Sequence, residues 1–510
     1  MKTFYVTTPI YYVNDQPHVG HAYTTLMADI LARYYRSKLG SDNVWFLTGT
    51  DEHGAKIQHS AEKNAISPKD YTDKVSAKFR LTWDRLEISN NDFIRTTEPR
   101  HELAVNKILQ KLKQAKTPAG NDAFYEKDYQ GLYCVGCESY IKEADLINGL
   151  CPAHQTKPEL VKEKNWFFRL SDFTDLLQKK IKKGELEILP KKRKNEVLGL
   201  LKLGLEDLAI SRRRVAWGIK VPWDLEQTVY VWVEALLNYI TALGYGSDQD
   251  DKFKRFWPVN LQLIGKDILK FHAVIWPAIL TSINLKLPDK IFAHGYFTID
   301  GQKMSKTLGN VIDPNEMIDK FGAEASRYLI VSQYPFGEDG DIKADLFAQT
   351  YNADLANGIG NLSSRILAIT EKYFHAAIPN IQPKDVFSTK KIWKNYRTKV
   401  ENLQIYEAIK EINSFVQTLD RYIAENKPWE LAKAETQSES LGAIVYNLNE
   451  ALRQLAWMIY PIMPQTSQSI FDKLGISDQL VEFNVVEAAE WGLLKSGTSV
   501  SKGSALFPRI

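Results

Sequence analysis

Two histidines near the start of the chain, His18 and His21, are one helical turn apart and enclose Gly20. They follow an apolar run at residues 3–8 and precede an amphipathic pattern that ends near residue 40, which predicts a strand, a turn and a helix. The start of such a helix offers unpaired N–H groups to an anion, and two imidazoles could donate further hydrogen bonds to phosphoryl oxygens. Gly20 would let a nucleotide come close to the backbone. The motif predicts a nucleotide phosphate site, although two surface histidines or a stray metal pair would show the same spacing.

A second motif, far downstream, places two lysines, Lys303 and Lys306, on either side of Ser305. It follows an Asp-Gly turn, which predicts a loop. Two ammonium groups on a loop could clamp a triphosphate from the side opposite the helix and stabilise the charge on departing pyrophosphate. By itself, a short segment with two lysines and a serine is ordinary loop composition. Together with the histidine motif it predicts an adenylation reaction.

The three cysteines of the chain all belong to one short pattern, Cys134-x-x-Cys137 followed by Cys151-x-x-His154. Four soft ligands at this spacing predict one closed, tetrahedral Zn²⁺ site with a structural role, because no position is left open for water. The alternative is three free thiols beside a surface histidine. So few cysteines make a disulfide framework improbable.

The remaining pattern predicts the elements that must position these residues. Apolar segments at residues 3–8, 44–47, 261–264 and 291–293 predict strands, with helical patterns after the first and third. Alternating strands and helices predict an α/β fold, a Rossmann-like doubly wound parallel sheet that binds ligands at its carboxyl edge. A Cys-containing and then very basic stretch interrupts the sheet at about residues 117–223. Beyond residue 351, long amphipathic patterns predict an all-α helical bundle.

The composition is that of an ordinary globular protein with several domains. Of the 510 residues, 44% are hydrophobic and 25% charged, and no apolar run approaches the roughly 20 residues that cross a bilayer. We therefore expect no membrane partner and, without a signal-peptide pattern, a cytoplasmic protein. A net charge of +3 does not by itself indicate nucleic acid. The basic runs at residues 179–183 and 191–194 could face RNA phosphates or be solvated helix faces.

The two motifs, in this order on two halves of a Rossmann-like sheet, resemble the HIGH and KMSKS signatures of the class I aminoacyl-tRNA synthetases. Thr307 stands where the second signature ends in serine, and keeps the hydroxyl. Four more segments are similar to the methionine-specific branch, so the resemblance covers essentially the whole chain: residues 9–14, 48–54, 231–235 and 265–267. It implies a monomeric enzyme that activates L-methionine with ATP and Mg²⁺ and then transfers it to the 3′ end of tRNA(Met).

The resemblance also assigns roles to individual residues. ATP would be bound by His18, Gly20, His21, His294, Gly295, Lys303, Ser305 and Lys306, with the motif histidines and lysines acting in catalysis. Methionine would be bound by Asp51 through its ammonium group, and by a pocket of Ile10, Tyr12, Trp232, Ala235, Leu236, Tyr239, Ile268 and His272. Leu236 stands where one branch has proline, and the spacing of the residues from 232 to 239 would also suit an ordinary helix core. The glycine of the His294-Gly295 turn would let adenosine approach, or the turn is only a strand end.

Three residues of the helical part resemble the family's anticodon readers: Asn361, Arg365 and Trp491. An amide, a guanidinium and an indole can pair with or stack on unpaired bases. The alternatives are a plain helix surface for the first two residues and a core plug for the tryptophan. For the whole chain, the alternatives are another class I aminoacyl-tRNA synthetase and a catalytically inactive RNA-binding paralogue.

These observations together predict a division of the chain into six parts. They are two halves of the Rossmann-like domain at 1–116 and 226–300, a connective insertion with a zinc knuckle at 117–225, a KMSKS-loop and stem-contact region at 301–350, a helical anticodon-binding domain at 351–475 and a C-terminal tail at 476–510.

Overall fold

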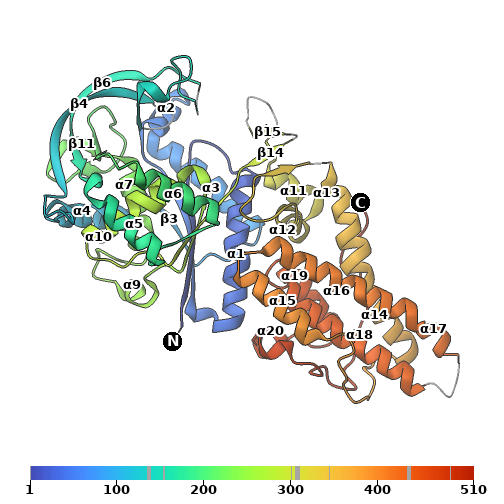
Figure 1. Ribbon diagram of the computed structural model, residues 1–510. Coiled ribbons are helices and arrows are strands. Elements are labelled where there is room, and N and C mark those ends of the chain that lie inside the picture. Colours follow the sequence, from blue (N-terminus) through green and yellow to red (C-terminus); the bar gives the residue numbers. More distant parts are fainter. Residues whose placement is uncertain are drawn as a thin grey trace.

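The computed structural model shows a sheet-containing lobe and a helical lobe, with helix α1 between them (Figure 1). It describes residues 2–134, 139–152, 155–299, 301–304, 311–343, 345–433, 438–482 and 484–510, with the backbone alone at 139, 303, 438, 481 and 482. No helix among these residues is long and apolar enough to cross a membrane.

The sheet lobe is built on six parallel strands in the order β3-β2-β1-β12-β13-β7. The strands are β1 (Phe4–Tyr12), β2 (Val44–Asp51), β3 (Asp92–Arg95), β7 (Glu187–Leu189), β12 (Leu261–Gly265) and β13 (Lys290–His294). Their order runs outward in both directions from the β1/β12 pair, and this switch point is where ligands bind in open sheets. The sheet confirms the predicted doubly wound fold.

Helices cover both faces of the sheet, and most residues of the strands are therefore buried. The helices of this lobe are α1 (Val19–Leu39), α2 (Ala55–Lys63), α3 (Pro68–Arg85), α4 (Pro99–Lys113), α7 (Val231–Leu236), α8 (Asn238–Thr241), α9 (Asp251–Phe256), a π-helical turn at Phe271–Ile275 and α10 (Trp276–Ser282). Helix α1 is buried on most of its surface and ends at Gly40, whose φ of 87° suits a residue without a side chain.

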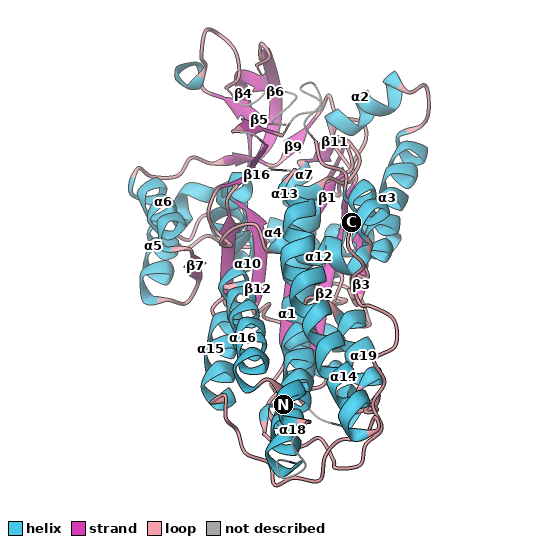
Figure 2. Cartoon of the chain, turned by 90° about the vertical axis from the view of Figure 1, so that its right-hand side faces the viewer, coloured by secondary structure: helices cyan, strands magenta, loops and turns pink. Residues whose placement is uncertain are grey.

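An antiparallel sheet, in the order β5-β4-β6-β8, arches over the carboxyl edge of the main sheet (Figures 1 and 2). The elements of this region are β4 (Phe124–Cys134), β5 (Ser139–Ile141), β6 (Glu159–Phe168), α5 (Thr174–Lys183), α6 (Lys191–Lys202), β8 (Leu208–Ala209), β9 (Ser211–Arg212), β10 (Lys220–Val221) and β11 (Asp224–Val229). Strand β7 lies within the same stretch of sequence, yet it pairs with β13 and extends the main sheet.

A small sheet and two helices connect the lobes: β14 (Phe297–Ile299), β15 (Gln302–Lys303), α11 (Pro314–Phe321), α12 (Ala323–Val331) and β16 (Gly340–Ile342). The helical lobe then contains α13 (Leu346–Thr350), a π-helical segment Tyr351–Gly360, α14 (Asn361–Phe374), α15 (Thr389–Glu401), α16 (Ile405–Asn426), α17 (Pro428–Leu431), α18 (Ser438–Ile459), α19 (Pro464–Lys473) and α20 (Gln479–Glu482). It lies at the opposite end of the molecule from the β4–β6 arch (Figure 2).

One buried arginine joins the two lobes. Arg327 in α12 donates to the Asp29 carboxylate of α1 at 2.6 Å, to the Leu86 carbonyl at 2.9 Å and to the Ile462 carbonyl at 2.7 Å. The Asp29 carboxylate is buried, which would raise its pKa, but the guanidinium groups of Arg327 and Arg33 lower the pKa to about 2. The helix that begins at the histidine motif is therefore fixed directly to the turn between α18 and α19.

Candidate functional site

The histidine motif forms the N-terminal cap of α1. The Gly20 N–H donates to His18 Nδ1 at 3.1 Å, and the His18 N–H donates to His21 Nδ1 at 3.2 Å, which closes a capping box. A ring nitrogen that accepts a hydrogen bond carries no proton, so the proton of each ring is on Nε2. Burial and the neighbouring His18 ring also lower the pKa of His21 well below 6.5. The cap thus fixes both rings as neutral Nε2–H donors at the start of a helix.

Gly20 is where the two predicted phosphate motifs meet. A Cβ atom at Gly20 would lie 2.9 Å from His18 Cε1, so a side chain would displace the ring that caps the helix. The same position is 3.4 Å from Met304 Cε, in the second motif. The backbone of Lys303 ends β15, while Ser305 and Lys306 lie outside the described residues. Met304, which belongs to the lysine motif, therefore lies beside Gly20 of the histidine motif, as an adenylation site requires.

His294 lies at the carboxyl end of β13 and faces α1. Its Nδ1 donates to the Gly295 carbonyl at 2.8 Å, and its Nε2 therefore accepts from the Thr24 hydroxyl at 2.7 Å. Burial lowers the pKa of His294, so this neutral form persists. A Cβ atom at Gly295 would lie 2.3 Å from the Glu338 carbonyl oxygen. Packing of one backbone segment on another thus gives a structural reason for this glycine, whereas the sequence left open the approach of adenosine and a plain strand end.

The ends of β1 and β2 bring together the first part of the predicted methionine site. Ile10 is paired with Gly49 and Tyr12 with Asp51 in parallel register, and the Val13 N–H donates to the Asp51 carbonyl at 3.1 Å. The Asp51 side chain is only 5% exposed. The carboxylate predicted to bind an ammonium group therefore lies at the carboxyl edge of the sheet, next to the β1 residues predicted to line the pocket.

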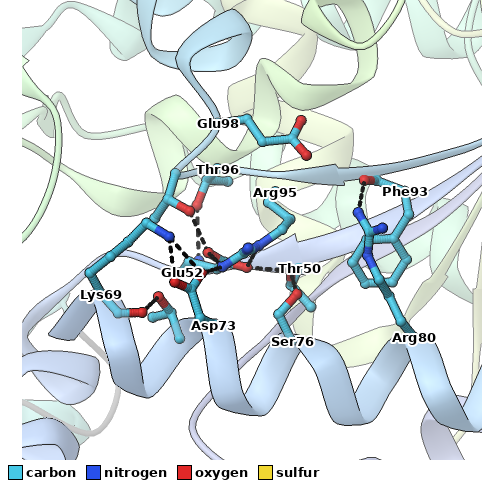
Figure 3. A network of polar contacts seen from close by, with 12 residues as sticks. Thr50, Glu52, Lys69, Asp73, Ser76, Arg80, Phe93, Arg95, Thr96 and Glu98 are labelled. Atoms are coloured by element: carbon cyan, nitrogen blue, oxygen red, sulfur yellow. Dashed lines mark hydrogen bonds and ion pairs between the residues drawn. The ribbon is translucent and has the colours of Figure 1, made fainter. Parts of the chain in front are cut away.

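Glu52, which follows Asp51, is held by a buried ion pair. Arg95 Nε and Nη2 donate to the two Glu52 carboxylate oxygens at 2.7 and 2.8 Å, and Arg95 also contacts Asp73 (Figure 3). The hydroxyls of Thr50 and Thr97 donate to the same carboxylate at 2.7 and 2.5 Å. A buried carboxylate with this many donors is well compensated. The network fixes the strand end that carries Asp51.

Aromatic side chains form the second part of the predicted methionine site. The Trp232 ring of α7 stacks on Phe271 with centroids 3.9 Å apart. The Ile268 carbonyl accepts from His272 Nδ1 at 3.0 Å, so His272 Nε2 accepts from the Tyr239 hydroxyl at 2.8 Å. Burial lowers the pKa of His272 to about 4. Predicted pocket residues from α7, α8 and the π-helical turn therefore come together as a neutral, largely aromatic group.

Two members of this aromatic group were not predicted. Phe271 stacks on Trp232, and the Trp276 ring lies 6.0 Å from that of Tyr239. Trp276 is completely buried, which the sequence could not distinguish from any other core tryptophan. Phe271 could have been suggested by its place beside His272. The remaining two predicted residues of α7, Ala235 and Leu236, are buried in the same helix.

The two described cysteines of the predicted zinc site, Cys134 at the end of β4 and Cys151, both contact Thr156. Cys134 and Cys151 are both buried. Thr156 lies between them: its hydroxyl is 3.9 Å from Cys134 Sγ, and its carbonyl accepts from the Cys151 N–H at 2.8 Å. Cys137 and His154 lie outside the described residues. Two buried thiols brought together in a segment with little core fit one half of a closed zinc site.

In the helical lobe, Asn361 is the first residue of α14, and Arg365 lies one turn later. Arg365 Nη1 donates to the Asp420 carboxylate of α16 at 2.5 Å. Trp491 packs on the bundle, with its ring 6.0 Å from Phe387, and its Nε1 is buried without a hydrogen-bond partner among the described residues. Trp429 in α17 was not predicted and is 42% exposed. Of these two tryptophans, Trp429 is the more exposed to solvent.

A parallel sheet with neutral histidine donors at its first helix, a second phosphate motif against them and a helical lobe beyond defines a class I aminoacyl-tRNA synthetase. The family described as tRNA synthetases class I (M) matches residues 4–157 and 137–367, and an anticodon-binding domain of tRNA ligases matches residues 387–499. The chain belongs to the methionyl-tRNA synthetase family, and its homologues carry the name methionine–tRNA ligase.

Relatives and solved structures agree over the full chain. The chain is 44% identical to the methionine–tRNA ligase of Caldanaerobacter subterraneus subsp. tengcongensis, covering 100% of this chain and 79% of that one. It is 40% identical to that of Streptomyces coelicolor, covering 100% and 97%. The structure of Mycobacterium tuberculosis methionyl-tRNA synthetase in complex with methionyl-adenylate matches with a TM-score of 0.93 and 34% identity, covering 100% of both chains.

Proposed function

We propose that this chain joins methionine to tRNA(Met) in two steps at the carboxyl edge of the sheet. The methionine carboxylate attacks the α-phosphorus of ATP, the bond to pyrophosphate breaks, and methionyl-adenylate remains. The terminal ribose hydroxyl of the tRNA then attacks the methionine carbonyl, loses its proton and releases AMP. The observation that carries the proposal is the capping box, because it holds two neutral Nε2–H donors beside Met304 at the start of α1.

The phosphate side of the site would act mainly by stabilising charge. His18 and His21 donate from Nε2 to phosphoryl oxygens, and Lys303, Ser305 and Lys306 approach from the opposite side as pyrophosphate departs. Gly20 keeps the helix start accessible, and His294 and Gly295 form the turn beside adenosine. Mg²⁺ would accompany ATP and neutralise part of its charge. None of these groups needs to accept a proton during activation.

The methionine side would act by shape and by one charge. Asp51 pairs with the ammonium group, while Ile10, Tyr12, Trp232, Ala235, Leu236, Tyr239, Ile268 and His272 enclose the side chain. The hydroxyl of Tyr239 and the ring of His272 already satisfy each other, so an apolar thioether leaves no buried polar group unpaired. A charged side chain would find no partner in this neutral pocket. The pocket therefore favours a long, flexible and uncharged side chain.

Anticodon recognition would use the exposed end of the bundle. Asn361 and Arg365 supply an amide and a guanidinium, and Arg365 is oriented by Asp420. Asp420 lies about 9 Å along the helix axis from the end of α16, and α17, which carries Trp429, follows directly. We assign the stacking role to Trp429, because its ring is exposed and that of Trp491 is packed. Chemistry and RNA choice then lie in different lobes.

The proposed function is tested by methionine-dependent exchange of pyrophosphate into ATP, measured across amino acids. We expect exchange with methionine and none above background with leucine, isoleucine or cysteine. Aminoacylation of tRNA(Met) by the same preparation should follow. Normal tRNA binding without exchange for any amino acid would instead identify an inactive RNA-binding protein. Sedimentation is expected to give a monomer of 58.3 kDa, and a cytoplasmic location agrees with these partners.

We further propose one structural Zn²⁺ held by Cys134, Cys137, Cys151 and His154, which would stabilise the β4–β6 arch without entering the reaction. Purified protein should contain about one zinc per chain. Cys134→Ser should lose the metal and make the insertion sensitive to protease, because metal binding and local folding are coupled. Glu143→Ser, an exposed change in the same segment, should keep both properties. Zinc-free protein with a protease-resistant insertion would contradict the assignment.

A further inference from the structure

A buried carboxylate lies behind the methionine pocket and has no role in the chemistry described so far. Glu234 in α7 is completely buried. Its Oε1 accepts from His53 Nδ1 at 2.9 Å and its Oε2 accepts from His101 Nε2 at 3.0 Å. These side chains come from the segment after β2, from α4 and from α7, which are far apart in the sequence. A polar cluster assembled from three elements and shielded from water is costly unless every member is satisfied.

The two histidines contact different parts of the molecule. His53 is two residues after Asp51, in the segment proposed to hold the methionine ammonium group. Glu234 lies between Trp232 and Ala235, in the helix proposed to enclose the methionine side chain. The His53–Glu234 bond therefore connects the two walls of one pocket, whereas the His101–Glu234 bond connects α7 only to α4 behind it.

Each wall has contacts of its own, and among the described residues the His53–Glu234 hydrogen bond joins one wall to the other. Helix α7 has only six residues and no side-chain hydrogen bond at its N-cap, so it is too short to hold its own orientation. The segment after Asp51 leaves β2 and is bound to Trp217 of the insertion by two hydrogen bonds. The Trp217 indole N–H donates to the Glu52 carbonyl at 2.6 Å, and the Gly54 N–H donates to the Trp217 carbonyl at 3.1 Å. A shift of either wall would change the distance between the ammonium site and the side-chain site.

The charges in the cluster favour a tight bond. Burial alone would raise the pKa of Glu234, but His53 and His101 lower the pKa below its usual value, so the carboxylate is ionised. Burial alone would lower the pKa of His53, but Glu234 and, further away, Glu102 and Glu52 raise it. Glu102 Oε1 is 3.8 Å from His53 Nε2.

We propose that Glu234 and His53 are positioning residues for methionine: their buried bond holds the Asp51 segment at a fixed distance from α7 and so sets the length of amino acid that fits. This inference rests on the proposed methionine site. It predicts an effect on methionine recognition alone, because within the described part of the chain the hydrogen bonds and ion pairs of these two residues go to each other, to His101 and to Glu102, and not to the histidine motif. Geometry, rather than the charge of Glu234, is what the pocket requires.

His53→Leu and His101→Leu form a matched pair, since each removes one donor from Glu234 but only the first breaks the connection between the walls. In pyrophosphate exchange, His53→Leu should raise the KM for methionine by about tenfold or more and leave the KM for ATP within about twofold, as expected for a misplaced substrate-binding group. Relative activity with longer and shorter methionine analogues should also change. His101→Leu should raise the KM for methionine less than about threefold.

Glu234→Gln separates geometry from charge. The glutamine oxygen can accept from one histidine and its amide can donate to the other, because His101 can move its proton to the side of the Thr241 hydroxyl, 2.8 Å from Nδ1. This variant should keep the KM for methionine within about threefold of wild type. A tenfold rise would show that the charge matters and would overturn the proposal.

The inference would be overturned if His53→Leu and His101→Leu raised the KM for methionine equally. It would also be overturned if the KM values for methionine and ATP rose together as the melting temperature fell. Either result would show that the cluster only stabilises the fold, and would leave the proposed function intact. Should the leucine variants fail to fold, calorimetric titration of Glu234→Gln with methionine decides the question at equilibrium. A wild-type chain without methionine-dependent exchange would instead refute the proposed function, and the inference with it.

Discussion

Replacement of His21 by alanine should lower the rate of methionine activation by about 100- to 1,000-fold, the loss typical of one preorganised donor to a charged transition state. The ring is neutral at physiological pH because burial and His18 lower its pKa well below 6.5, and its proton is on Nε2 because Nδ1 accepts from the His18 backbone. Its donor is therefore in place before ATP binds and needs no reorganisation during the reaction. The affinity for methionine should change less than about twofold, since the ring belongs to the phosphate side of the site.

The control for this prediction is His59→Ala. His59 is an exposed histidine of α2, whose nearest charged partner is Glu62 at 3.7 Å. Its removal should leave activation unchanged. Loss of the His21 side chain also removes one capping bond, which costs about 1 kcal/mol of helix stability and should appear as a small decrease in melting temperature. Single-turnover activation that is as fast in His21→Ala as in wild type would show that the ring only caps the helix.

The elements that the sequence predicted best are those whose burial is one-sided or complete along their whole length. The buried strand expected at residues 3–8 is β1, and the strand expected at 291–293 is β13. One of the long amphipathic patterns expected beyond residue 351 is helix α16, at Ile405–Asn426. Hydrophobic periodicity is a local property, so it can be read from the chain alone.

The details that the sequence could not predict all depend on contacts between distant segments. Nothing near residues 187–189 indicates a sixth strand, because β7 exists only through its pairing with β13. Gly295 is required by the backbone of Glu338, which lies 43 residues further along the chain. The next residue, Tyr296, is held to the same segment, because its N–H donates to the Asp339 carboxylate at 2.7 Å. The tautomers of His18 and His21 follow from a cap whose geometry must be seen before it can be used.

The anticodon residues show why the type and spacing of residues are not enough. The sequence offered Trp491 both as a reader of bases and as a core plug, and did not consider Trp429. Burial separates the two: the Trp491 segment is held to the bundle, because the Gly492 and Leu494 N–H groups each donate to the Glu450 carboxylate at 3.0 Å. Glu450 is in turn paired with Arg453, and both are completely buried. These contacts favour the core role for Trp491, whose ring is partly buried against the bundle, and we expect the more exposed Trp429 to stack on the base.

The second large effect is therefore expected from Trp491→Ala, and it should be a loss of stability. Truncation of a packed tryptophan costs about 3 to 5 kcal/mol, and the partial exposure of this ring favours the lower end. Trp429→Ala should leave the melting temperature nearly unchanged, because the residue is 42% exposed, but should lose about 1 to 3 kcal/mol of tRNA(Met) binding, the contribution of one stacked base.

Melting, tRNA binding and tRNA-independent exchange, measured on both tryptophan variants, separate these roles. Activation should remain near wild type in Trp429→Ala, since α17, which carries this residue, lies at the far end of the helical lobe from helix α1 and the sheet lobe (Figure 1). In Trp491→Ala, any loss of tRNA binding should disappear at temperatures where the variant is fully folded. If Trp491→Ala instead melts normally and binds tRNA weakly while Trp429→Ala binds it well, the roles of the two rings are reversed. The exposure of an aromatic residue would then be a poor guide to base stacking in this lobe. The hydrogen bonds from the Gly492 and Leu494 N–H groups to Glu450 would also have to break when RNA binds.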